Sequence, residues 1–520
     1  LRHQSMIQKK QNSSSMLERI KNGLLSVVFG QFILTAGNFI LVPIFLIFWT
    51  PTKYGEWLTM YSLAAYIAAL DPGIRLAIVN KMTQLYSVND LKQYRLYLHS
   101  SIFLFILISF TGTLILIPTI YFLPLNKLFG FIEINSSQTK WVIFFLSLQA
   151  LWVLPAGLVT AVYRTNGNFS TSQWLANIRQ FISLALIPII LYLGGGIILA
   201  AFSQIVSVFV VFWALWDIKK RFPELSPGLE SVSLKNLTQI IPYGFYFFLL
   251  DIGLILLHQG SVIIISIKLG GALVALYVIS RTLSNLIRIF TRHFLSPLWP
   301  ELTAMEVLNE TEKLVSTHRL TIFISTALSI VIASTMWFEG PKFISFWTNG
   351  KIIPDPTLLR LLLVYLVLQT PWMSSSLVLK AANKHKEIAW LQFSSTIIGL
   401  SSSILLIEYY SLTGLVIGLI IGEFVCCYFW IIKKTCALTK ESFKKLICQI
   451  WGILILLSVT SVLFSWIIKT YIDFNVFLQL AIILFITITN ASFLTYKICF
   501  NTKEKDTIKN IFGHFLFKKQ

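Results

Sequence analysis

A long run of apolar residues decides the fold class: residues 99–123 read HSSIFLFILISFTGTLILIPTIYFL, with no Asp, Glu, Lys or Arg among them. At about 1.5 Å of rise per residue, a helix of this length crosses the roughly 30 Å hydrocarbon core of a bilayer. The rest of the chain has the same character, since 56% of its 520 residues are hydrophobic and only 12% are charged. A soluble chain carries about 25% charged residues. The sequence therefore predicts an all-α protein that spans the membrane many times.

Fourteen such runs can be placed along the chain. They cover residues 23–48, 57–78, 99–123, 141–163, 174–193, 197–216, 238–266, 272–292, 318–337, 358–379, 389–407, 412–432, 447–468 and 474–496. We group them into a first lobe, a cytoplasmic linker, a second lobe and two extra helices, at residues 23–216, 217–237, 238–432 and 447–496. Basic tails at 1–22 and 497–520 flank the spans, and the second tail is expected either to orient the protein or to bind anionic membrane lipids. The connections are too short to hold a sizeable domain outside the membrane.

The distribution of basic residues predicts the orientation. Both tails and the even-numbered connections hold 31 of the 42 Lys and Arg residues, whereas the odd-numbered connections hold 7. Because Lys and Arg accumulate on the cytoplasmic side of a membrane protein, both termini are expected in the cytoplasm. The formal net charge of +20 then reflects this orientation, and we expect no nucleic-acid partner.

The two halves of the chain are similar at a displacement of 220 residues. The displacement aligns Leu148, Gln149 and Trp152 with Leu368, Gln369 and Trp372. Because it covers six spans, an even number, we expect two parallel repeats related by an axis along the membrane normal. Such duplication is typical of alternating-access transporters that bind substrate between two lobes. Chance similarity among apolar helices is the alternative.

The eighth span carries three arginines, Arg281, Arg288 and Arg292. A charge at the centre of a span costs roughly 2.5–3.5 kcal/mol on insertion scales, so such residues indicate function. Spacings of 7 and 11 residues place the three on one helix face. We expect this stripe to line a water-filled cavity and to bind an anion. Snorkelling to the cytoplasmic surface is the alternative for Arg292 and Arg288.

Other polar residues within spans are candidate counter-ions or coupling groups. Asp251 and His258 share a face of the seventh span, where Asp251 is either a releasable counter-ion of the arginines or a structural partner. His258 is expected to be a neutral hydrogen-bonding group, with a proton relay as the alternative. Glu423, in the twelfth span, is a candidate coupling site or a partner for a neighbouring Lys.

The first half contributes Asp71, Arg75 and Arg179. Pro72 and Gly73 break the helix beside Asp71, which is therefore expected to cap the break. Arg75 is expected at the cytoplasmic mouth of the protein. Arg179 either snorkels to the surface or joins the cavity.

Signatures of enzymes and cofactors were not found. The five cysteines all lie at or beyond Cys426 without the spacing of a disulfide framework or a zinc site. The sequence lacks a phosphate-binding glycine loop, a dinucleotide-binding glycine run and a zinc-protease His pair. We therefore expect a protein that is not an enzyme and needs no cofactor or metal. Coupling to an H⁺ or Na⁺ gradient or to the membrane potential is left open.

Several segments carry a resemblance to a known family. They are the basic N-terminal tail and the segments Tyr54–Trp57, Asp71–Gly73, Tyr163–Gly167 and Gly340–Trp347. Together they resemble the polysaccharide-transporter (Wzx-type) lipid-linked oligosaccharide flippases of the multidrug/oligosaccharidyl-lipid/polysaccharide exporter superfamily. The resemblance covers nearly the whole chain.

The resemblance implies a bacterial inner-membrane flippase with two six-helix lobes and two further helices. Its substrate would be an undecaprenyl-pyrophosphate-linked oligosaccharide, such as an O-antigen, capsule or exopolysaccharide repeat unit. A cationic cavity between the lobes is implied for the pyrophosphate, and Arg281, Arg288 and Arg292 match it by type and depth. Arg75 and Arg179 would draw the head group in. The implied protein partners are a polysaccharide polymerase and a chain-length regulator.

Two other functions are alternatives to a flippase. A multidrug or cation exporter of the same superfamily favours an acidic cavity, whereas the deep charges here are mainly Arg. A membrane-embedded polysaccharide polymerase or ligase normally needs a large exported loop, and the longest external connection here has about 20 residues.

Overall fold

A computed structural model of the chain describes residues 2–68, 72–471 and 475–499. Within these residues the structure is all-helical, which confirms the predicted fold class. The chain folds into two compact units, which comprise residues 1–274 and residues 275–520. The division falls within the helix α11 (Gly271–Ser284). The predicted pair of six-helix repeats, with a lobe boundary before residue 238, stays a prediction.

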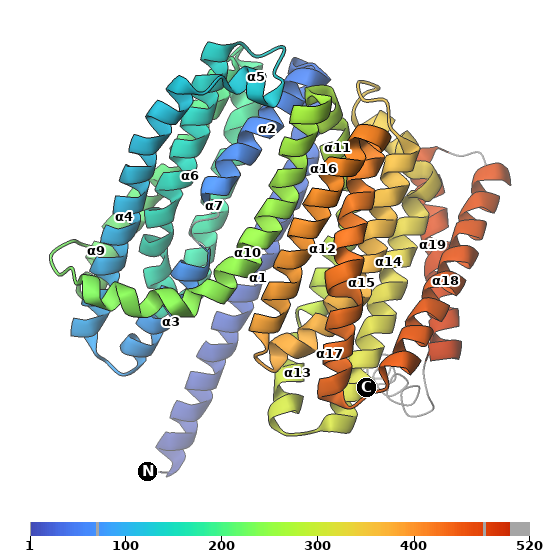
Figure 1. Cartoon of the computed structure of the whole chain (residues 1–520). Coiled ribbons are helices and arrows are strands. Elements are labelled where there is room, and N and C mark those ends of the chain that lie inside the picture. Colours follow the sequence, from blue (N-terminus) through green and yellow to red (C-terminus); the bar gives the residue numbers. More distant parts are fainter. Residues whose placement is uncertain (1, 69–71, 472–474, 500–520) are drawn as a thin grey trace. The chain divides into compact units, whose positions relative to one another are not determined.

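The first unit is formed by ten helices in the described part of the chain. They are α1 (Arg2–Phe48), α2 (Pro51–Ala68), α3 (Pro72–Ser87), α4 (Leu91–Phe122), α5 (Leu125–Phe129), α6 (Ser136–Thr165), α7 (Phe169–Tyr192), α8 (Ile197–Val206), α9 (Val210–Arg221) and α10 (Leu234–Leu269). The helix α6 lies within the unit, where it packs against α2, α4, α7 and α8 (Figure 1). Tyr94, Phe105, Leu158 and Tyr163 form part of the core between α4 and α6.

The helix α10 packs against α2 and α3 and belongs to the first unit. The approach is close at two glycines. A β-carbon on Gly55 of α2 would lie 1.7 Å from the carbonyl oxygen of Gly271. Real side chains never come this close, so only glycine fits at this crossing of α2 and the start of α11.

The second unit contains α12 (Leu286–Leu295), α13 (Leu298–Val307), α14 (Thr311–Trp347), α15 (Pro356–Ala381), α16 (His385–Glu423), α17 (Phe429–Thr439), α18 (Phe443–Tyr471) and α19 (Val476–Leu494). A π-helical turn, Phe424–Tyr428, joins α16 to α17. The helix α14 packs against α15, and α18 and α19 also pack on it (Figure 1). Most of α14 and α15 is therefore buried inside the unit.

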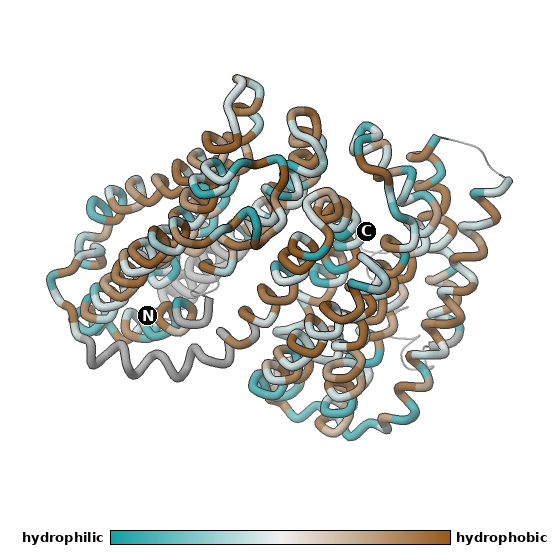
Figure 2. The backbone as a smooth tube through the Cα atoms, turned by 45° about the horizontal axis from the view of Figure 1, so that its top comes forward, coloured by the Kyte–Doolittle hydropathy of each residue, from teal (hydrophilic) through white to brown (hydrophobic). Residues whose placement is uncertain are grey.

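Twelve helices in the described residues are long and apolar enough to cross a membrane. Figure 2 shows hydrophobic residues along these helices and many of the hydrophilic ones at helix ends and connections. Of the fourteen expected spans, the second is divided between α2 and α3. The eleventh and twelfth are two helices that fold back on each other at Ser411, whose φ is 53°, within the range of α16.

Candidate functional site

A cavity of about 340 Å³ lies inside the first unit, between α3, α6, α7 and the segment that leads into α9. Its size is at the lower end of the range typical of small-ligand sites. Three arginines line it, Arg75 from α3, Arg164 from α6 and Arg179 from α7. No acidic residue occurs among the described residues that line it. We call these three residues the arginine cluster.

The end of α6 positions Arg164. Its Nε donates a hydrogen bond to Oγ of Ser172 over 3.1 Å, and its guanidinium lies 5.2 Å from the ring centroid of Phe169. Both partners belong to α7, which the chain reaches through a turn at Gly167 with a φ of 85°. Because this φ favours glycine, the short turn depends on Gly167 to bring α7 back onto Arg164. The last carbonyl groups of α6 also favour a cation at this position.

Space for Arg75 is provided by Gly157 of α6, which has no side chain to occupy the same volume. Arg75 lies within electrostatic range of both Arg164 and Arg179. The positive charges of Arg75 and the other two guanidinium groups around one cavity favour the binding of an anion. Arginine presents a planar fork of N–H donors that matches phosphate oxygens, so phosphate groups are suitable anions.

The second unit contains a chain of polar side chains that starts at Arg288 of α12. Nη2 of Arg288 donates to Oε1 of Gln369 over 2.9 Å, and Nε2 of Gln369 donates to Oε1 of Glu423 over 2.6 Å. The hydroxyl of Tyr365 donates to the same carboxylate oxygen over 3.3 Å. Gln369, Tyr365 and Glu423 are buried, whereas Arg288 is half-buried. This arrangement joins an arginine to a buried acid through one amide.

The predicted stripe of Arg281, Arg288 and Arg292 lies across two helices, because α11 ends at Ser284 and α12 begins at Leu286. Arg288 still lies within electrostatic range of both other arginines. The guanidinium of Arg281 lies 5.2 Å from the ring centroid of Tyr277, and Arg292 is exposed. Whether the stripe borders a water-filled cavity stays a prediction.

Three other expected site residues are Asp71, Asp251 and His258. Asp71 and the side chain of Asp251 lie outside the described residues, so their expected roles stay predictions. His258 is half-buried in α10 and has an interaction partner. Among the described residues, no group of three or more His, Cys, Asp and Glu side chains is arranged to hold a metal ion.

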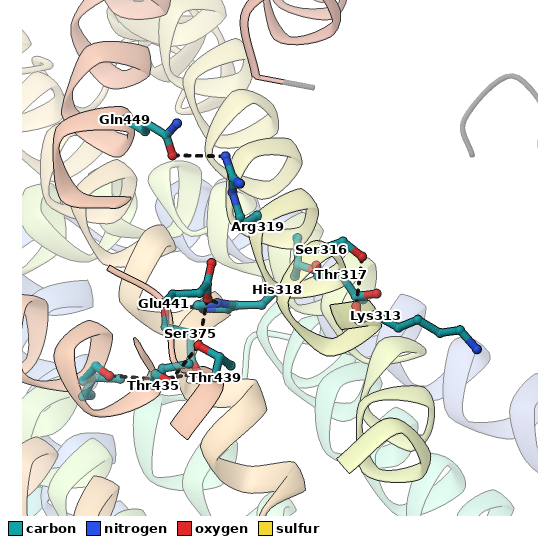
Figure 3. Close-up of polar contacts among 12 residues, drawn as sticks. Lys313, Ser316, Thr317, His318, Arg319, Ser375, Thr435, Thr439, Glu441 and Gln449 are labelled. Carbon is teal, nitrogen blue, oxygen red and sulfur yellow. Dashed lines mark hydrogen bonds and ion pairs between the residues drawn. The ribbon is translucent and has the colours of Figure 1, made fainter. Parts of the chain in front are cut away.

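Sequence reasoning missed a buried histidine near the start of α14, His318. Its Nδ1 lies 2.8 Å from Oε2 of Glu441 and its Nε2 lies 3.1 Å from Oγ of Ser375, as Figure 3 shows. Thr439 donates to the same oxygen of Glu441 over 2.8 Å. Ser375 and His318 are each 0% exposed, so a substrate cannot reach the serine. The arrangement of Ser, His and Glu therefore stabilises the fold.

Arg164 and Gln369 were also missed as site residues. Both appear in the comparison of the two halves, where Arg164 aligns with Lys384 and Gln369 with Gln149. Arg164 follows the apolar run at the end of a span, which is the ordinary place for a basic residue. Its position therefore gave no signal, and only the turn at Gly167 brings it to the cavity.

No family profile and no curated protein matches the sequence. Solved structures do match. A lipid II flippase, MurJ, in an inward closed conformation has a TM-score of 0.70 with 13% identity and covers 91% of this chain and 98% of its own. An inward-facing multidrug resistance MATE family transporter of the MOP superfamily has a TM-score of 0.62 with 19% identity and covers 78% of this chain and 99% of its own. At these identities the likeness establishes the fold alone: the chain has the fold of these transporters.

Proposed function

We propose that this protein is a Wzx-type flippase of the bacterial inner membrane. It moves an undecaprenyl-pyrophosphate-linked oligosaccharide from the cytoplasmic to the outer leaflet by alternating access. The observation that carries the proposal is the arginine cluster, since Arg75, Arg164 and Arg179 line one cavity of the first unit without an acidic neighbour in its described lining. Such a cavity selects an anionic head group.

A diphosphate suits the arginine cluster in both charge and geometry. It carries at least two negative charges and several acceptor oxygens, and charge-assisted hydrogen bonds to arginine contribute about 1.5–3 kcal/mol each. Arg288 of the second unit offers a further cation that is already oriented by Gln369. The lipid chain stays in the bilayer while the head group crosses, so the protein does not have to enclose the whole substrate.

The membrane potential provides part of the driving force for this export. An inside-negative potential favours outward movement of negative charge by about 2.3 kcal/mol per elementary charge per 100 mV. A head group with two charges therefore gains about 4.6 kcal/mol per 100 mV. Polymerase and chain-length regulator proteins would then act on the exported unit.

The alternative within the same fold is a multidrug exporter, as the name of the MATE neighbours indicates for those proteins. Organic cations require acidic or aromatic surfaces, and the lining of the described cavity is basic. The polymerase or ligase alternative has less support, because the matching structures are those of a flippase and of transporters.

The test is transport of a fluorescently labelled pyrophosphate-linked saccharide lipid in vesicles that contain the purified protein. Arg75→Ala and Arg179→Ala should each slow transport at least tenfold, while Lys92→Ala should leave it unchanged. Lys92 is a matched control because it is an exposed cation of the same unit. Transport of organic cations by the wild-type protein, with no movement of the saccharide lipid, would reject the proposal in favour of the multidrug exporter.

A further inference from the structure

Glu423 is a buried acid within a candidate membrane span, and its carboxylate faces uncharged hydrogen-bond donors. The residue is 8% exposed and ends α16 directly before the π-helical turn. Its Oε1 accepts two hydrogen bonds, from Gln369 and Tyr365. Its Oε2 makes no hydrogen bond of good geometry among the described residues, and the indole N–H of Trp372, which also makes none, interacts with the carboxylate from α15. Turns of π-helix inside α-helices occur frequently at functional sites.

A negative charge at Glu423 depends on the arginine that faces it through Gln369. Burial of an ionised carboxylate is costly unless a cation or several donors compensate it. The donors around the carboxylate carry no charge, and Arg288 supplies the positive charge one side chain away. Gln369 directs its carbonyl oxygen toward Arg288 and its amide nitrogen toward Glu423. A change in the charge of Arg288 therefore affects the stability of the carboxylate of Glu423.

The remaining titratable groups around Glu423 do not replace it as the proton-binding group. Tyr365 faces it from α15, and Cys426 and Cys427 face it from the π-helical turn. Phenols and thiols are neutral at physiological pH unless a cation or a metal favours ionisation. Arg288 faces it from α12 and stays charged. Among these groups, the carboxyl of Glu423 is the one able to exchange a proton.

We propose that Glu423 binds a proton when an anion binds at Arg288. This inference rests on the proposed function, since it takes the diphosphate head group as the anion. An anion at Arg288 neutralises the guanidinium and so removes the charge that stabilises the carboxylate. A proton from water then adds to the carboxylate, and the neutral carboxyl group keeps its hydrogen bonds at Oε1. By linkage, protonation of Glu423 strengthens anion binding to the same extent.

The experiment is a titration of the purified full-length protein with inorganic pyrophosphate in weakly buffered solution, with a pH indicator. The wild-type protein should take up about one proton per pyrophosphate bound at Arg288, after subtraction of the uptake by pyrophosphate itself. Glu423→Gln should bind pyrophosphate and lose this uptake. Arg288→Gln should also lose it, while the arginine cluster of the first unit still binds pyrophosphate.

Glu339→Gln is the matched control, because Glu339 is another fully buried acid of the second unit. Its Oε2 lies 3.0 Å from Nζ of Lys342. This variant should keep the uptake of the wild-type protein. Uptake that persists in Glu423→Gln, or that survives in Arg288→Gln, overturns the inference. Uptake that is absent from the wild-type protein while pyrophosphate binds overturns it as well.

The two proposals fail in different ways. If pyrophosphate binds with proton uptake but labelled saccharide lipid is not moved across vesicles, the proposed function is wrong and the proton linkage remains. If the lipid is moved and Glu423→Gln shows the wild-type proton uptake, the linkage is wrong and the flippase remains. Should Glu423→Gln fail to fold, Arg288→Gln and Gln369→Leu provide the same comparison with Glu423 in place.

Discussion

Gly157 of α6 leaves room for the guanidinium of Arg75: a β-carbon on Gly157 would lie 2.3 Å from Nη1 of Arg75. The contact is with the end of a flexible side chain, so a larger residue would displace the guanidinium and leave the backbone in place. The position of one arginine of the cluster therefore depends on the absence of a side chain on the neighbouring helix. This relationship allows the site to be perturbed without removal of a charge.

Gly157→Ala should weaken pyrophosphate binding about tenfold, which corresponds to the loss of one charge-assisted hydrogen bond of about 1.4 kcal/mol. Isothermal titration with inorganic pyrophosphate measures the change. Gly452→Ala in α18 is the control, because a β-carbon there meets nothing within 4 Å. The control should bind normally and be slightly more stable, since alanine favours a helix by about 1 kcal/mol over glycine. Equal affinity of Gly157→Ala and wild type would contradict the assigned position of Arg75.

Arg179→Lys should keep part of the affinity for pyrophosphate that Arg179→Ala loses. Lysine retains the positive charge but lacks the planar fork that binds two phosphate oxygens at once. We expect binding in the order wild type, Arg179→Lys, Arg179→Ala, with each step several-fold. The same titration at two salt concentrations should show a weaker salt dependence for Arg179→Ala. An Arg179→Lys variant that binds as well as the wild type would show that only charge matters.

Glu56→Ala should destabilise the first unit without a change of charge in the cavity. The buried carboxylate of Glu56 accepts hydrogen bonds from the backbone N–H groups of Ile132, Glu133 and Ile134, over 2.6, 3.0 and 2.8 Å. Removal leaves three N–H groups without this acceptor, and each such loss costs about 1–3 kcal/mol when the group is buried. Thermal unfolding followed by Trp fluorescence should show a midpoint several degrees lower. Glu230→Ala, an exposed acid of the same unit, should leave the midpoint unchanged.

His318 and Glu441 should be energetically coupled, since Nδ1 of His318 lies 2.8 Å from Oε2 of Glu441 and both residues are largely buried. His318→Gln and Glu441→Gln should each lower the thermal midpoint. The double variant should cost less than the sum of the two, with a coupling energy of about 0.5–3 kcal/mol. Pyrophosphate affinity should stay that of the wild type in all three variants. Strictly additive effects would show that the pair contributes no interaction energy.

The multi-spanning fold could be predicted because each apolar run is a local property. A helix satisfies its own backbone hydrogen bonds, so about 20 apolar residues suffice to predict a span. One prediction of this kind depended on more than local composition. The run 57–78 contains Pro72 and Gly73 and is divided into α2 and α3, whereas the expected break between the runs 389–407 and 412–432 lies at Ser411 within α16.

The site was predicted less completely, because its residues come from different helices. The sequence predicted four of the site residues, because a charge within a span has a high free-energy cost and so indicates function. They are Arg75, Arg179, Arg288 and Glu423. Arg164 and Gln369 gave no such signal, since one ends a span and the other is uncharged. Their importance comes from the turn that returns α7 to α6 and from the packing of α12 on α15.

By itself, the sequence determined that this chain folds in a membrane and which runs of residues form spanning helices. It also determined that the charges within the spans are mainly positive. These follow from free energies of transfer, which are sums over neighbouring residues. Only the tertiary structure decided that three arginines share one cavity, that Gly157 gives one of them its place and that Glu423 reaches Arg288 through Gln369. The physical reason is that hydrogen bonds and steric contacts act over a few ångströms between helices, a proximity that spacing along the chain does not specify.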